Sequence, residues 1–175
     1  MKRTVAVLLL FMFLLSSIPV FSEPVFFPNG IQWGMSPTEV YTLAGDDLSG
    51  EMLLSTHVTG LSHAEEFDGY AAGAAYLFAD GSLFAKEYTF YGNADYDSVY
   101  AKLYDDLSSV YGEPRALPVQ SVTDLFSLIY FTDINAARFS RGAAWETPDG
   151  TKLWLFMDSG HYPCVIYTDP AFDFS

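Results

Sequence analysis

Apolar and polar positions follow a helical period between Asp95 and Tyr111. At about 100° per residue, eight apolar side chains share an arc of about 140°, and polar side chains such as Asp106 occupy the other side. The apolar arc is formed by Val99, Val110, Leu103, Tyr96, Leu107, Tyr100, Tyr111 and Tyr104. Gly112 follows, at the position where glycine often ends a helix. The pattern predicts an amphipathic helix with one buried face.

A shorter helix is predicted after Ser36 from its capping residues. Ser36 is a suitable N-cap, Pro37 suits the first helical turn, and Glu39 completes a capping box with the serine. Gly45 marks the end of this helix.

A nine-residue stretch occurs twice and predicts two equivalent hairpins. Gly73–Gly81 and Gly142–Gly150 lie 69 residues apart, and five of their nine positions are identical. Each copy ends in Asp-Gly, a strong hairpin signal, and is followed by a run typical of a strand. Because alanine is a poor strand former, the alanines shared by both copies indicate places where a helix approaches the sheet closely.

Apolar and aromatic runs predict further strands. These runs are Met52–Val58, Leu83–Tyr91, Thr151–Met157 and Pro163–Thr168. The segment Ala116–Ala137 has a less regular pattern, in which Asp124–Phe131 fits either a strand or a short helix.

Together these elements predict an α+β fold with helices packed on an antiparallel sheet. We expect two tandem helix-plus-antiparallel-sheet units, at about 31–92 and 93–170, within one continuous domain that covers residues 23–175. A single domain suits a chain of 175 residues of which half are hydrophobic. No linker rich in proline, glycine or serine separates the two units.

Ile31–Val40, followed by Gly45, resembles the opening of small exported bacterial modules of the outer-membrane-lipoprotein-A and β-lactamase-inhibitor-protein-like group. In those modules a turn like Gly34–Ser36 starts a helix that leads into an antiparallel meander. Tyr111–Pro114 resembles the start of a second such unit. The resemblance implies a non-catalytic protein-binding module. This chain lacks the lipobox of the lipoproteins and the disulfides of the inhibitors, so neither specific role carries over.

Residues 1–22 have the pattern of a cleaved secretory signal peptide. Two basic residues precede Val5–Leu15, an unbroken run of 11 apolar residues, and Ser22 is a small residue at the expected cleavage point. A membrane anchor usually needs about 20 apolar residues, and Pro19 interrupts this run early. We expect the mature chain to begin at Glu23, to have no membrane span, and to be periplasmic or extracellular.

The charge balance limits the classes of partner. Twenty-two acidic residues against eight basic ones give a formal net charge of −14, which becomes −16 after loss of the two basic residues in the signal peptide. Nucleic acids and anionic lipids attract basic surfaces, so neither is expected to bind. A protein partner is expected to carry basic residues.

His57 and His63, with Glu65, Glu66 and Asp68, form the only local group of candidate metal ligands. Their spacing matches no established ligand pattern. We interpret the segment as a solvated loop between two strands, with a transition-metal site as the alternative. No metal or other cofactor is expected.

Other residues that often carry chemistry have structural interpretations here. Acidic residues around Asp95 fit the cap of a helix better than a calcium loop, which requires a glycine that this stretch lacks. Cys164 lies in an apolar run and is predicted to be buried, and a single cysteine excludes an internal disulfide. Trp33, Trp145 and Trp154 are predicted to be core residues. The chain contains no serine-nucleophile or phosphate-binding glycine motif.

The sequence therefore assigns no catalytic residue, metal ligand or cofactor site, and it leaves the binding residues open. We expect an exported, non-catalytic module that binds a protein or peptide, in envelope assembly or in inhibition of an external enzyme. Two alternatives stay open. One is a secreted hydrolase that uses dispersed carboxylates with His57, His63 or His161, and the other is an acidic protein that binds a small ligand or a cation.

Overall fold

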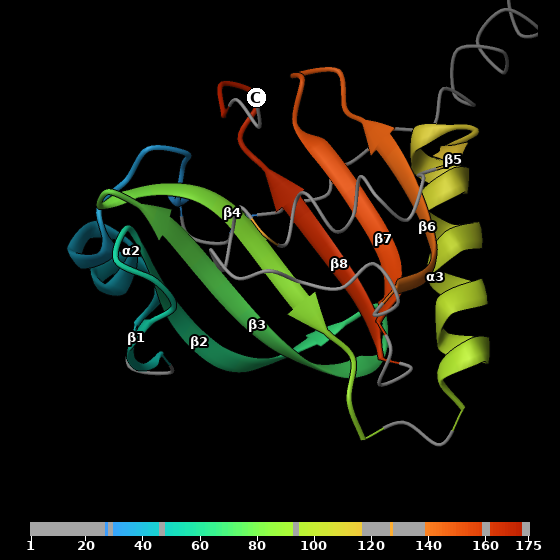
Figure 1. Ribbon diagram of the computed structural model, residues 1–175, viewed down its shortest axis with the longest axis horizontal. Coiled ribbons are helices and arrows are strands. Elements are labelled where there is room, and N and C mark those ends of the chain that lie inside the picture. Colours follow the sequence, from blue (N-terminus) through green and yellow to red (C-terminus); the bar gives the residue numbers. More distant parts are fainter. Residues whose placement is uncertain are drawn as a thin grey trace, which may run out of the picture.

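The computed structural model describes residue 27 and residues 30–45, 48–92, 95–116, 127, 139–158 and 162–172. These residues form an eight-stranded antiparallel sheet flanked by two helices (Figure 1), which confirms the predicted α+β class. The predicted signal peptide and nearly all of Ala116–Ala137 lie outside the described residues.

The sheet is built in two halves, each of which follows a helix. Helix α2 (Pro37–Ala44) precedes β1 (Ser49–Leu53), β2 (Val58–Phe67), β3 (Tyr70–Ala79) and β4 (Ser82–Thr89). Helix α3 (Tyr96–Tyr111) precedes β5 (Arg115–Ala116), β6 (Phe139–Glu146), β7 (Lys152–Asp158) and β8 (Pro163–Thr168). The order across the sheet is β1-β2-β3-β4-β8-β7-β6-β5, so the halves join where β4 pairs with β8.

Both helices begin and end at the residues that the capping pattern predicts. The side chain of Ser36 accepts a hydrogen bond from the Glu39 amide, and the Glu39 carboxylate accepts one from the Ser36 amide, which completes the capping box. Asp95 caps α3 by accepting a hydrogen bond from the Ser98 amide. A glycine with a left-handed backbone ends each helix, at φ 86° and 84°.

The two helices pack on the same face of the sheet. Leu103 and Leu107 of α3 are buried in a cluster with Trp145 and Ala143 of β6 and with Ala74 of β3. The prediction from the recurring alanines is confirmed for one alanine of each pair, because strand alternation turns the next alanine to the other face. Towards the β1 side of the sheet, Val40 of α2 is buried in a cluster with Tyr76 of β3. The other face carries a third cluster, formed by Val58, Leu77, Phe84, Ala85, Phe156, Cys164 and Ile166.

Two predictions about the first half are wrong. Met52–Val58 is not one strand, because the chain turns after Leu53 and the amides of Leu54 and Ser55 both donate to the Val58 carbonyl. The segment that contains His63 and Glu65 is not a loop but β2, which pairs with both β1 and β3. Its polar residues belong to the two-residue alternation of a strand and not to a solvated connection.

The repeated stretches lie in different places relative to the preceding helix. Gly73–Gly81 covers the end of β3 and its turn into β4, and Gly142–Gly150 covers β6 and its turn towards β7. Among the described strands, β3 is the third after α2 and β6 is the second after α3. The sequence repeat and the order of the strands are therefore offset by one strand.

Candidate functional site

The structure separates the residues that the sequence grouped as candidate metal ligands. His57 lies before β2, with its Nδ1 3.0 Å from Oδ1 of Asp80. His63 lies on β2, with its Nε2 2.9 Å from Oε2 of Glu65. Among the residues that the structure describes, no three histidine, cysteine or acidic side chains are placed to hold a metal ion together. His161 lies outside the described residues.

Glu65 is instead at the centre of a largely buried polar group on the helix-covered face. We call this group the Glu65 cluster, and its members are His63, Glu65, Tyr76, Lys86 and Tyr88. The Lys86 ammonium is fully buried and donates to Oε2 of Glu65 at 3.1 Å. It also lies 5.0 Å from the ring centre of Tyr76 and 4.6 Å from that of Tyr88. The His63 ring stacks on Tyr76, with the ring centres 5.6 Å apart.

The Glu65 carboxylate balances the charge of the buried Lys86 ammonium, which would be costly to bury alone. Burial lowers the pKa of Lys86, and the neighbouring Glu65 carboxylate opposes that change. Burial by itself would raise the pKa of Glu65, but hydrogen bonds from His63 and Lys86 and the charge of Lys86 outweigh it, so this pKa lies below its ordinary value. Burial and the charge of Glu65 raise the pKa of Tyr76 to about 12. The cluster is therefore an ion pair surrounded by neutral tyrosines, without an activated nucleophile.

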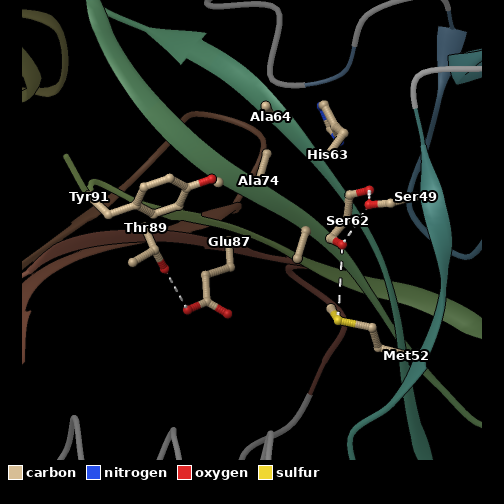
Figure 2. Close-up of a pocket in the computed structure, with 11 residues that line it drawn as sticks. Ser49, Met52, Ser62, His63, Ala64, Ala74, Glu87, Thr89 and Tyr91 are labelled. Carbon is tan, nitrogen blue, oxygen red and sulfur yellow. Dashed lines mark hydrogen bonds between the residues drawn. The ribbon is translucent and has the colours of Figure 1, made fainter.

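Small residues on the opposite face of β2 and β3 leave a depression of about 430 Å³, which we call the trough (Figure 2). Ser62, Ala64, Gly73 and Ala75 form its floor. Because strand side chains alternate between faces, these residues are interleaved with those of the Glu65 cluster and of the core beneath the helices.

Two large exposed side chains stand on either side of the trough. Tyr91 points into it from the side of Thr89, and Met52 of the edge strand β1 lies across from it (Figure 2). Tyr91 is 48% exposed and Met52 is 40% exposed. The tyrosine ring lies so close to Gly73 that a Cβ there would be 2.7 Å from its Cε1. Glycine at position 73 therefore allows Tyr91 to lie against the floor.

Among the described residues, the polar side chains that line the trough include two serines, a threonine and a carboxylate. Ser49 of β1 donates to the Ser62 carbonyl at 2.5 Å. Glu87 and Thr89 lie at the base of the trough in Figure 2, with the Thr89 hydroxyl donating to Oε1 of Glu87 at 3.4 Å. Glu87 is only 8% exposed. The trough therefore combines apolar sides with a few polar groups, of which the Glu87 carboxylate is nearly buried.

Sequence analysis overlooked Lys86 and Glu87, although a signal for both was present. They are adjacent charged residues inside the apolar run predicted as the strand Leu83–Tyr91, where charged residues are unusual. Strand alternation places them on opposite faces, so Lys86 enters the Glu65 cluster and Glu87 enters the trough.

The predictions of core positions for the cysteine and the tryptophans are confirmed in part. Cys164 is 3% exposed on β8 and Trp145 is 3% exposed on β6, which confirms both as core residues. Trp33 and Trp154 are only partly buried. No helix among the described residues is long and apolar enough to span a membrane.

Comparison with known proteins finds no matching family, no matching curated protein and no matching solved structure. The resemblance to exported helix-plus-meander modules therefore rests on the residues quoted for it, Ile31–Val40 and Tyr111–Pro114, and stays a prediction.

Proposed function

We propose that this chain is an exported, non-catalytic module that binds a protein or peptide through the trough. The observation that carries the proposal is the trough itself, a depression floored by small side chains and flanked by exposed Met52 and Tyr91. An apolar surface bordered by polar groups is typical of an interaction site.

The partner that we propose is an extended, basic segment of another protein. Glu51 is exposed on the neighbouring edge strand β1, and the whole chain has a net charge of −14. This charge steers positive surfaces towards the chain. Alternate side chains of an extended segment fit a shallow floor of small residues.

The described side chains favour binding over catalysis. His57 and His63 each lie against a carboxylate, at Asp80 and Glu65. A histidine that activates a nucleophile instead lies against a hydroxyl or thiol. Cys164 is buried on β8, away from the exposed, electropositive setting that a nucleophilic cysteine requires.

The finer architecture that we propose is two tandem units in one domain, α2 with β1–β4 and α3 with β5–β8. The strand order supports this division. From either edge of the sheet to its centre, the described strands follow one another in the same order as they follow α2 or α3 along the chain. The repeated stretch lies in the third described strand of the first unit and in the second described strand of the second unit. The repeat alone therefore does not match equivalent strands of the two units. The resemblance to exported modules implies the same two-unit plan.

Affinity capture with the mature chain, residues 23–175, from the extracytoplasmic fraction of the source cell tests the binding proposal. Ala64 is exposed on the trough floor, so Ala64→Arg should abolish capture by adding bulk and positive charge. Ala101 is exposed on α3, so Ala101→Arg is the matched control and should retain the partner. Capture should also weaken when salt rises from about 0.05 to about 0.5 M, because the Debye length falls from about 14 to about 4 Å.

Three results would contradict parts of the proposal. Equal capture by the Ala64→Arg and Ala101→Arg variants would show that the partner binds elsewhere. Capture that is insensitive to salt would exclude a basic partner held by charge. Catalytic turnover that is lost when His57 or His63 is replaced would favour the hydrolase alternative.

A further inference from the structure

A second cavity lies on the helix-covered face, between α3 and the neighbouring ends of β2, β4 and β8. We call it the α3 cavity, and its volume is about 390 Å³, within the range of about 300–1,000 Å³ that is typical of small-ligand sites. It lies on the opposite side of the sheet from the trough, so the two sites are independent.

The inner wall of the α3 cavity is aromatic and aliphatic. Tyr88, Leu103 and Tyr167 are almost completely buried there, with exposures of 3%, 1% and 1%. Phe67 adds a further ring, whose centre lies 4.7 Å from that of Tyr88. Val110, 41% exposed on α3, also lines the cavity. A ligand with a hydrophobic body would bury that body against these side chains.

Among the described residues, all the charged side chains that line the α3 cavity are carboxylates. They are Glu65, Glu66, Asp68 and Asp106. Glu65 is the innermost of them and belongs to the Glu65 cluster. Its Oε2 accepts the hydrogen bonds from His63 and Lys86, whereas its Oε1 has a long contact of 3.5 Å with the Tyr88 hydroxyl. Oε1 is therefore the atom of this carboxylate that has capacity for a further donor.

The chain itself places an ammonium group on two of these carboxylates. Lys102 of α3 donates to Oδ2 of Asp68, in the turn between β2 and β3, at 2.6 Å, and it also donates to Asp106. The lysine thus links α3 to the β2–β3 turn across two lining residues of the cavity. Asp68 and Asp106, two of the carboxylates that line the cavity, therefore already bind a primary ammonium group of the chain.

We propose that the α3 cavity binds a small organic cation with a hydrophobic body, an ammonium or guanidinium group on an alkyl or aryl stem. The stem lies against Tyr88, Tyr167 and Leu103, and the charged head donates to Oε1 of Glu65. A carboxylate ligand has no donor for Oε1 of Glu65, and a neutral ligand leaves the charge-assisted hydrogen bond to Glu65 unmade. Aromatic rings beside the head add a favourable cation–π contribution.

Two kinds of ligand carry such a cationic group on a hydrophobic stem: a free amine, and an arginine or lysine side chain of a protein. The probes are therefore phenethylammonium, as a free amine, and N-acetyl-arginine methylamide, as a peptide side chain, titrated into the mature chain and followed by NMR shifts. Saturable binding of either probe supports the proposal, and the tighter probe identifies the source. Phenethyl alcohol and hydrocinnamate, the neutral and anionic analogues, should bind at least about ten-fold more weakly than phenethylammonium.

Two substitutions on α3 locate the binding. Val110→Trp should fill the cavity from the helix and weaken binding of the preferred probe about ten-fold or more. Ala101 lies on the opposite side of the helix, nine residues away, so Ala101→Trp is the matched control and should leave binding unchanged. Equal effects of these two variants would overturn the assignment to the α3 cavity.

Charge substitutions test the role of the carboxylates. Glu65→Gln should weaken binding of the cationic probes while leaving the weak binding of phenethyl alcohol unchanged. Lys102→Met, which removes the competing ammonium without altering the buried pair, should strengthen binding and keeps the test valid if Glu65→Gln does not fold. Ala64→Arg, in the trough, should have no effect. Failure of both probes to bind the wild-type chain, or equal binding of the alcohol, would overturn the proposal while leaving the trough untouched.

Discussion

Lys86 and Glu87 show how two adjacent residues determine the chemistry on both faces of a sheet. The Lys86 side chain is fully buried under the helices, where Glu65 and two tyrosine rings surround its ammonium. Glu87 points the other way and lines the trough. Removal of one member of a buried ion pair leaves the other uncompensated, so Glu65 and Lys86 depend on each other for the stability of the fold.

Glu65 should make the fold less stable in acid. Its pKa in the folded chain lies below the ordinary value of 4.5, so its contribution to stability is complete above about pH 4.5 and is lost as the pH falls through the folded pKa. Glu65→Gln should therefore show a weaker loss of Tm than the wild type between about pH 6 and 3. Thermal unfolding followed by circular dichroism measures this difference.

The control for this experiment is the next residue along β2. Glu66 is exposed, so Glu66→Gln should keep the acid dependence of the wild type. If the Glu65→Gln and Glu66→Gln profiles coincide, the Glu65 cluster does not contribute to acid stability as we describe.

Helix α3 is buried over a narrower face than its sequence predicts. Of the eight apolar residues in the predicted arc, Val99, Tyr100, Leu103 and Leu107 are buried. Val110 and Tyr104, at 41% and 36% exposure, are not. Among the described residues, α3 packs mainly on β6, β7 and β8. Val110 lies beside this contact and lines the α3 cavity.

The orientation of α3 can be tested by two truncations. Leu103 is 1% exposed, so Leu103→Ala should lower the free energy of unfolding by about 2–5 kcal/mol through lost burial and a new cavity. Asp105, exposed on the same helix, should tolerate Asp105→Ala within about 0.5 kcal/mol. Urea denaturation of both variants provides the measurement, and similar losses would mean that Leu103 does not face the sheet.

Sequence predicted the local features of these elements well and their long-range partners poorly. The boundaries of α2 and α3 follow from Ser36, Asp95 and the two terminal glycines, which act within a few residues. In contrast, β2 was predicted as a loop because its polar residues acquire partners only across the sheet. Glu65 pairs with Lys86, 21 residues further along the chain, and the walls of the α3 cavity come from four separate elements. A local sequence pattern covers only a few residues and therefore does not predict contacts between residues so far apart in the chain.

The two binding surfaces that we propose lie on opposite sides of one sheet. The trough lies on the face opposite the helices, and the α3 cavity, lined by four carboxylates, lies on the helix-covered face. With a net charge of −14, both surfaces lie in the same negative field and attract the same sign of ligand. Their difference is in shape, because one is a shallow floor and the other is an aromatic-walled cavity.

The proposed location of the molecule gives a direct prediction. Protein purified from the source cell should begin at or near Glu23 and should be recovered outside the cytoplasm, because residues 1–22 have the pattern of a secretory signal peptide. N-terminal sequencing of protein from fractionated cells checks both points. Cytoplasmic protein that retains Met1 would contradict export.

The position of β8 has a consequence for how the chain folds. This strand follows the other seven described strands in the chain, yet it lies between β4 and β7 and is buried along its whole length. Until β8 arrives, β4 and β7 each have an unpaired edge that is able to join another chain. The contact that closes the sheet is also distant in sequence, since Ala85 pairs with Thr168, and such contacts form slowly. The two halves of the sheet are therefore joined in one late step, and aggregation competes with folding until that step is complete.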